Sequence, residues 1–127
     1  MRLSDAQKEF CFDISRLIQY IWDYDGGIYT CTFGDAYRDP RSHGKMGEKM
    51  VTEDGKKVYG RPMSAHKQRL AVDLNVFKDG QYQTTTEAHR PFGEYWESMH
   101  PDHVWGGNFG AGGQDGNHYS RRYHGVA

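Results

Sequence analysis

The chain has 127 residues, enough for one compact catalytic domain but too few for such a domain plus a separate targeting module. It carries 16 lysines and arginines against 17 aspartates and glutamates, so the formal charge of -1 creates no overall field favouring nucleic acid or an anionic membrane. With 9 Tyr, 6 Phe and 3 Trp, aromatic side chains must supply much of the core. We expect a single domain, residues 1–127. Composition does not fix the oligomeric state, and we expect a monomer.

The N-terminus turns polar at once, and no apolar run approaches the length of a membrane span. We therefore expect neither a secretory signal peptide nor stable insertion into a membrane. Cys11 and Cys31 lie inside apolar-patterned segments, which favours buried free thiols over a structural disulfide and indicates synthesis in a reducing compartment. A protein of this kind that acts outside the cytoplasm needs another factor to release it.

The first third of the chain predicts a helix, a strand and a loop. Apolar residues recur at helical spacing over residues 5–23, behind a Ser4 and Gln7 pattern that is typical of a capping box. Residues 28–33 are rich in β-branched and aromatic side chains and predict a strand. Residues 34–60 carry glycine, proline and mixed charge, which predicts a long loop that could be a flap over a site or a surface excursion.

The rest of the chain predicts two more strands and a second helix. Strict alternation over residues 70–77 predicts a strand that turns its aliphatic side chains to the core and Asp73 to the opposite face. An Asp79-Gly80 pair predicts a tight hairpin, and a helix is expected from about residue 86 to residue 99. Glycines punctuate the C-terminal segment, where residues 118–120 are the best candidate for a short strand.

Two histidines and an aspartate carry the most specific chemical signal: His66, Asp73 and His118. Two imidazoles and one carboxylate leave a tetrahedral Zn²⁺ one open position, the arrangement that a metal needs to activate water. An extended chain from His66 to Asp73 spans roughly 23 Å, so residues 67–69 must contain a turn if both bind one ion. His118 must then arrive on an adjacent strand. The pattern predicts a metallohydrolase with its zinc site on a sheet face.

Two further residues are candidates for the chemistry. Asp115 lies three residues before His118 on a glycine-rich turn, and we expect it to act as the general base and acid that moves the proton of the activated water. Attack on an amide creates an oxyanion, and Arg38 could supply its positive partner or hold a substrate carboxylate. The alternatives are that Asp115 only forms an Asx-turn and that Arg38 only pairs with Asp39 at the surface.

Several other polar and aromatic residues are expected to have structural roles. Trp96 and Trp105 are expected to pack in the core rather than to form a sugar-stacking platform, and the Arg121-Arg122 pair is expected to be solvated. Five histidines are expected to be surface or satisfied residues without a metal role: His43, His89, His100, His103 and His124.

The segments that hold the candidate ligands resemble the zinc peptidases that include D-alanyl-D-alanine carboxypeptidases and the L-alanyl-D-glutamate endopeptidases of bacteriophage endolysins. Two motifs carry the likeness, which covers about residues 28–127. The family's Ser-x-His-x-x-Gly-x-Ala-x-Asp motif is matched in register, except that Arg69 occupies the glycine position, and its Asp-x-x-His motif is matched as well. The matching residues are Ser64, His66, Ala71 and Asp73 for the first motif and Asp115 and His118 for the second.

Two further segments are similar to parts of these proteins. Gly34-Asp-Ala-Tyr-Arg38 is similar to the family's arginine-bearing segment. Trp105-Gly-Gly, followed by Asp115-Gly-Asn-His-Tyr-Ser120, is similar to the phage branch. Tyr119-Ser120 stands where many carboxypeptidases carry an aromatic residue and then an acid, which favours an endopeptidase.

The resemblance implies a fold and a set of roles. The fold is α+β, a small antiparallel sheet flanked by helices, in agreement with the elements expected above. His66, Asp73 and His118 would bind zinc, and Asp115 would be the catalytic base. Arg38 and Ser64 would contact the substrate, although Ser64 could instead cap a turn.

We therefore expect a phage lytic enzyme that is made in the cytoplasm of a bacterial host and reaches the wall after release by another factor. It would cut the peptide stem of peptidoglycan, with the L-alanyl-D-glutamate bond as the first candidate, by metal-activated water. The alternatives are a D-alanyl-D-alanine carboxypeptidase and a non-catalytic virion or wall-binding protein that keeps the metal as a brace. The absence of a wall-binding module fits compact endolysins by analogy.

Overall fold

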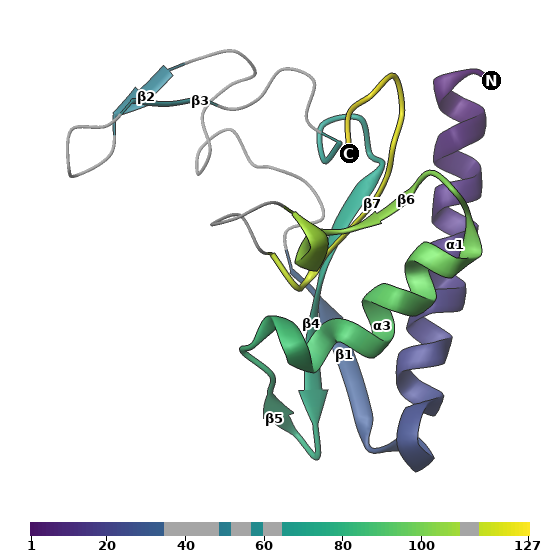
Figure 1. The fold of residues 1–127 in the computed structure, drawn as a ribbon, viewed down its shortest axis with the longest axis vertical. Coiled ribbons are helices and arrows are strands. Elements are labelled where there is room, and N and C mark those ends of the chain that lie inside the picture. The colour runs from purple at the N-terminus through teal and green to yellow at the C-terminus, as the bar shows by residue number, and fades with distance from the viewer. Residues whose placement is uncertain (35–48, 52–56, 60–64, 110–114) are drawn as a thin grey trace.

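The computed structural model describes residues 1–34, 49–51, 57–59, 65–109 and 115–127 (Figure 1). Two of the expected site residues, Arg38 and Ser64, lie outside these ranges. No helix in the described ranges is long and apolar enough to span a membrane.

Helix α1 (Leu3–Asp23) forms as its apolar spacing predicts, and a face with Phe10, Leu17 and Ile21 is buried. The predicted capping box is wrong, because the helix begins before Ser4. Arg2 occupies the N-cap position without a side-chain hydrogen bond. The Gln7 side chain, expected to complete the box, donates instead to the carbonyl of Gln68 at 2.8 Å. It therefore ties α1 to the turn that precedes the central strand.

Both cysteines are free, as expected, but they are not buried as expected. Cys11 is exposed because it lies on the solvent side of α1, and Cys31 is half-buried on the first strand. Burial raises the pKa of the Cys31 thiol, partly offset by a hydrogen bond with Trp22.

One antiparallel sheet holds five of the strands, in the order β1 (Tyr29–Phe33), β4 (Ala71–Lys78), β7 (His118–Arg121) and β6 (His103–Trp105), with β5 (Gln81–Tyr82) paired to the far end of β4. The strands expected over residues 28–33, 70–77 and 118–120 are therefore confirmed, whereas β6 was not predicted. The Asp79-Gly80 hairpin is also confirmed. Both of its residues have positive φ, 50° and 78°, which suits the right-handed twist of the paired strands.

The loop expected over residues 34–60 is interrupted by a short hairpin. Strands β2 (Lys49–Val51) and β3 (Lys57–Tyr59) pair with each other in antiparallel fashion, so the expectation of a loop is wrong for these six residues. Whether this segment forms a flap depends on residues outside the described ranges.

Helices α1 and α3 (Thr86–Met99) pack against the sheet and share one hydrophobic core with it (Figure 1). The Thr85 hydroxyl caps α3 by accepting from the Ala88 amide at 3.2 Å, one residue before the expected start. Trp96 and Trp105 are fully buried in this core, as expected of packing residues. The aliphatic side chains of β4 point into it, so Asp73 lies on the opposite face of the strand. The α+β fold with a small antiparallel sheet is confirmed.

Candidate metal centre

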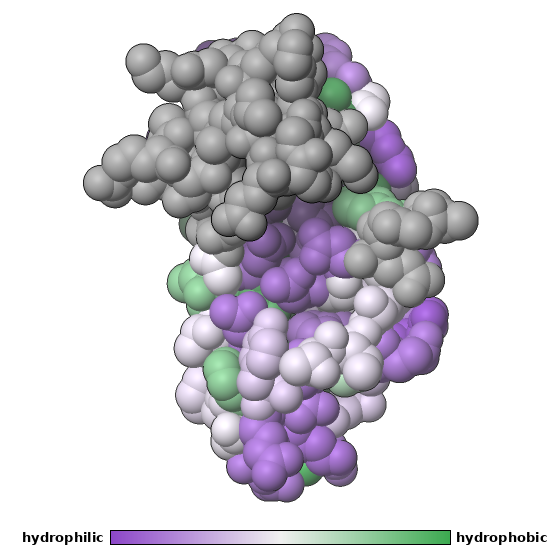
Figure 2. Space-filling view, turned by 90° about the vertical axis from the view of Figure 1, so that its left-hand side faces the viewer, coloured by the Kyte–Doolittle hydropathy of each residue, from purple (hydrophilic) through white to green (hydrophobic). Residues whose placement is uncertain are grey.

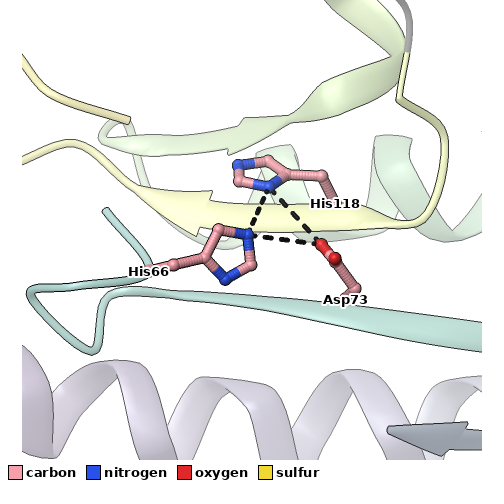
Figure 3. Close-up of side chains that lie close together, drawn as sticks. All are labelled: His66, Asp73 and His118. Atoms are coloured by element: carbon pink, nitrogen blue, oxygen red, sulfur yellow. Dashed lines mark hydrogen bonds and ion pairs between the residues drawn. The ribbon is translucent and has the colours of Figure 1, made fainter. Parts of the chain in front are cut away.

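Three side chains from different parts of the chain converge on the sheet face (Figure 3). Asp73 on β4 is the direct cross-strand partner of His118 on β7, which places the two side chains on the same face. His66 comes from a turn before β4, in which the Arg69 amide donates to the carbonyl of His66 at 3.1 Å. The turn expected over residues 67–69 and the expected arrival of His118 on an adjacent strand are both confirmed.

The distances among the three side chains match those between the ligands of a single ion. Nε2 of His66 lies 3.2 Å from Nδ1 of His118 and 3.4 Å from Oδ1 of Asp73. Nδ1 of His118 lies 3.6 Å from the same Oδ1. Ligands at 2.0–2.2 Å in a tetrahedral site are separated by roughly 3.3–3.6 Å, which is the length of a tetrahedron's edge. The three atoms can therefore hold one metal ion with little rearrangement.

Burial and charge also suit a cation. His66 and His118 are 2% and 5% exposed, so neither ring is a solvated surface group. Burial alone would raise the pKa of Asp73, but pairing with the His118 and His66 imidazoles outweighs it and lowers the pKa to about 2. The Asp73 carboxylate is thus ionised near neutral pH. Its Oδ1 atom is buried, and no donor in the described part of the chain is aligned to hydrogen-bond it.

The contact between Nε2 of His66 and Nδ1 of His118, together with packing, orients the two rings. The distal nitrogens, Nδ1 of His66 and Nε2 of His118, are buried and have no hydrogen-bond partner among the described residues. The ring of Phe109 lies against that of His118, with centroids 5.2 Å apart. Ligating imidazoles usually donate their second N–H to a carbonyl or carboxylate, and this support is absent from the described ranges.

Arg69 follows His66 in the turn and has a φ of +56°. This position is the glycine of the motif that the sequence resembles, and here a residue with a side chain has a left-handed backbone. The amide of Leu70 donates to the carbonyl of Ala65 at 2.8 Å, and this hydrogen bond closes the turn. A side chain therefore occupies a conformation that costs free energy for any residue except glycine.

Backbone hydrogen bonds fix the turn that contains Asp115. Its amide donates to the carbonyl of Gly106 at 3.0 Å, and its carbonyl accepts from the amide of His118 at 3.1 Å. The indole Nε1 of the buried Trp105 donates to the carbonyl of Gly116 at 2.7 Å. These contacts set the backbone of the expected base relative to the strand that carries His118.

Three glycines allow this close packing. A Cβ on Gly106 would lie 2.2 Å from the Asp115 carbonyl oxygen and 2.7 Å from Cβ of His118. A Cβ on Gly93 or Gly107 would lie 2.0 Å or 2.2 Å from the ring of Trp105. Trp105 is therefore enclosed by positions that only glycine can occupy without a shift.

Asp115 also borders a polar cavity between the start of α3 and the turn of residues 115–117. Hydrophilic surface occupies the middle of the face of the molecule opposite α1 (Figure 2). The cavity is also lined by His89, which is 3% exposed, and the charge of Asp115 raises the pKa of His89 against the larger lowering caused by burial. His89 was expected to be a surface or satisfied residue. Its Nε2 is satisfied by the carbonyl of Gln83, but its Nδ1 is buried and has no hydrogen-bond partner in the described ranges.

The two expected substrate-binding residues, Arg38 and Ser64, lie outside the described residues. The start of the segment with Arg38 is nevertheless placed. The amide of Gly34, at the end of β1, donates to the carbonyl of Asp73 at 2.7 Å. That segment thus begins beside a candidate ligand.

Comparison with known proteins assigns no family to the chain: no family model matches it, and no curated protein matches it. Sequence reasoning brought together the three candidate ligands and expected close backbone approaches at the C-terminal glycines, but it singled out neither His89, which lines the cavity, nor Gly93, which lies against Trp105. The Trp105-Gly-Gly run was a usable signal for the glycines, whereas nothing local in the sequence marks His89. What the structure itself supports is a buried group of two histidines and one aspartate that could hold a metal ion.

Proposed function

We propose that the chain is a zinc-dependent peptidoglycan endopeptidase of the phage endolysin type. The single observation that carries the proposal is the triangle of His66, Asp73 and His118, whose edges of 3.2, 3.4 and 3.6 Å fit three ligands of a tetrahedral ion. Two neutral nitrogens and one carboxylate suit Zn²⁺, and three protein ligands leave one position for water, as catalytic zinc sites do. A structural site would close that position with a fourth ligand.

In this proposal zinc would supply a Lewis acid and make a bound water acidic near neutral pH. Asp115 would accept a proton from the attacking water and return it to the departing amine. The Asp115 amide is bonded to Gly106, and the Trp105 indole holds the carbonyl of the next residue, Gly116, so the backbone of this turn needs little reorganisation when substrate binds. Arg38 holds the developing oxyanion or a carboxylate of the stem, and Ser64 contacts the same substrate.

The substrate is the peptide stem, cut at the bond between L-alanine and D-glutamate, and the enzyme acts on the wall after another factor releases it from the host cytoplasm. The likeness of Trp105-Gly-Gly and of residues 115–120 to the phage branch, with Tyr119-Ser120 after the last histidine, supports this choice over the carboxypeptidase. Product analysis separates the two, because a carboxypeptidase releases terminal D-alanine and an endopeptidase splits the stem.

Two substitutions test the assignment of roles. Asp115→Ala is expected to keep zinc and fold but to lose wall lysis, by a factor on the order of 10²–10⁴, because only the proton transfer is removed. His66→Ala is expected to lose the metal as well as the activity. Zinc content is measured by elemental analysis and cleavage by mass spectrometry of digested peptidoglycan.

The matched control is Glu94→Gln, which removes one exposed carboxylate from α3 and should leave both readouts unchanged. Lysis by Asp115→Ala at the parent rate would remove the proposed base. Zinc bound at one ion per chain with no cleavage by the parent protein would favour the non-catalytic brace.

A further inference from the structure

The cavity beside Asp115 has a volume of about 180 Å³ and lies between the start of α3 and the Asp115–Asn117 turn. Pockets for whole drug-sized ligands measure about 300–1,000 Å³, so this one has room for a single small residue. Hydroxyl and amide groups dominate the described part of its lining, which includes Gln83, Thr84, Thr85, Thr86 and Asn117. The next residue in the chain is the candidate ligand His118, so cavity and metal centre share one turn.

The tautomer of His89 follows from its one hydrogen bond. Nε2 lies 3.2 Å from the backbone carbonyl of Gln83, and because a carbonyl can only accept, Nε2 must carry the proton. Burial lowers the pKa of this ring, more than the bond to Gln83 and the charge of Asp115 raise it, so the imidazole is neutral at pH 7. Nδ1 then presents a lone pair.

This lone pair needs a donor. Nδ1 of His89 is buried and has no hydrogen-bond partner in the described part of the chain, and an unsatisfied buried acceptor costs about 1–3 kcal/mol. The side chain of His89 lines the cavity, so a group that binds there and displaces the atoms now covering Nδ1 can supply the missing donor.

The charges around the cavity select the kind of donor. Neither lysine nor arginine is among the described residues that line it, and Asp115 is the acidic one. A substrate carboxylate would therefore meet like charge. The first amides of α3 point toward the same side as its capping residue Thr85, which disfavours a full positive charge. A neutral peptide N–H suits both conditions.

We propose that this cavity is a subsite for the substrate residue next to the scissile amide and that the backbone N–H of that residue donates to Nδ1 of His89. The inference rests on the proposed function and deepens it, because it names the part of the stem peptide that Asp115 must lie beside. It assigns His89 to substrate binding rather than to proton transfer.

Two substitutions of His89 separate its two nitrogens. In His89→Gln the side-chain amide reaches the position of Nε2 and keeps the donor to Gln83, but the acceptor at Nδ1 is lost. In His89→Asn the side-chain oxygen lies near the position of Nδ1 and keeps the acceptor. The assay is hydrolysis of a synthetic stem peptide and of two analogues. One analogue is N-methylated at the amide before the scissile bond, and the other at the amide after it.

His89→Gln is expected to raise KM about tenfold with kcat within about twofold, as for the loss of one substrate hydrogen bond, and His89→Asn to recover part of that loss. One of the two N-methylated peptides is expected to have a KM about tenfold higher than the unmethylated peptide with the parent enzyme. With His89→Gln, the same methylation is expected to leave KM unchanged. Two results would overturn the subsite without affecting the proposed endopeptidase activity. One is a parental KM for a folded, zinc-loaded His89→Gln, and the other is that each methylation raises the KM of His89→Gln by the same factor as it raises that of the parent.

The tautomer gives a readout that does not depend on turnover. Nitrogen-15 NMR of the parent protein should find the proton of His89 on Nε2, and addition of the stem peptide should shift the Nδ1 resonance. If no stem peptide is cleaved, the proposed function fails. The subsite is then decided by this titration alone: an unshifted Nδ1 resonance at millimolar peptide, or a proton on Nδ1, refutes it.

Discussion

Arg69 offers a direct test of the turn between two candidate ligands. Its φ of +56° lies in the left-handed region, which costs roughly 1–2 kcal/mol for a residue with a Cβ. Glycine avoids this cost but loses about 0.5–1 kcal/mol through the greater freedom of its unfolded chain. The free energy of unfolding of Arg69→Gly should therefore be higher than that of Arg69→Ala by about 0.5–1 kcal/mol.

Alanine is the correct reference because Arg69 makes an interaction of its own, which both substitutions remove equally. For a chain of this length the difference corresponds to about 2–4 °C in Tm. Thermal unfolding followed by circular dichroism, with a chelator present so that metal binding makes no contribution, measures it. An Arg69→Ala variant as stable as Arg69→Gly would show that the backbone is not left-handed there in solution.

Three further predictions concern the site and the core. Gly106→Ala should displace the Asp115 turn, since the new Cβ would lie 2.2 Å from the Asp115 carbonyl oxygen, and should lower zinc content and lysis together; undiminished lysis would contradict the packing. Burial lowers the folded-state pKa of His89 and of His103, so both rings bind protons more readily in the unfolded chain, and the free energy of unfolding should fall as pH drops below about 6.5. Chemical denaturation between pH 5 and 8 measures this, and His103→Gln should flatten the profile. Zinc at 100 times its Kd should raise the free energy of unfolding by about 2.7 kcal/mol in the parent but not in His66→Ala, as a denaturant titration with and without a chelator will reveal.

Local patterns in the sequence predicted the features of the fold that depend on neighbouring residues alone. The alternation along β4 places Asp73 opposite the core, and the Asp79-Gly80 pair fixes its hairpin. The approach of His118 to Asp73 depends on strands far apart in the chain, and it was predicted only because two imidazoles and a carboxylate must meet if they bind one ion.

Long-range pairing of polar groups was not predictable. Arg121 was expected to be solvated but is 4% exposed. Its guanidinium donates a hydrogen bond to the carboxylate of Glu9 on α1 at 2.8 Å. His103 is likewise buried, with its ring stacked on Trp96 at 3.6 Å and Nε2 at 3.2 Å from a carboxylate oxygen of Asp13. Each of these partners lies on an element whose position follows from the whole fold, so no pattern near Arg121 or His103 reveals it.

The indole of Trp105 connects the interior of the protein to its reactive turn, since glycines lie against its rings and its Nε1 donates to the carbonyl of Gly116. Anyone transplanting the Asp115–His118 loop into a different scaffold must therefore carry the tryptophan and its glycine neighbours along. Moved by itself, the loop would lose the anchor that aims it.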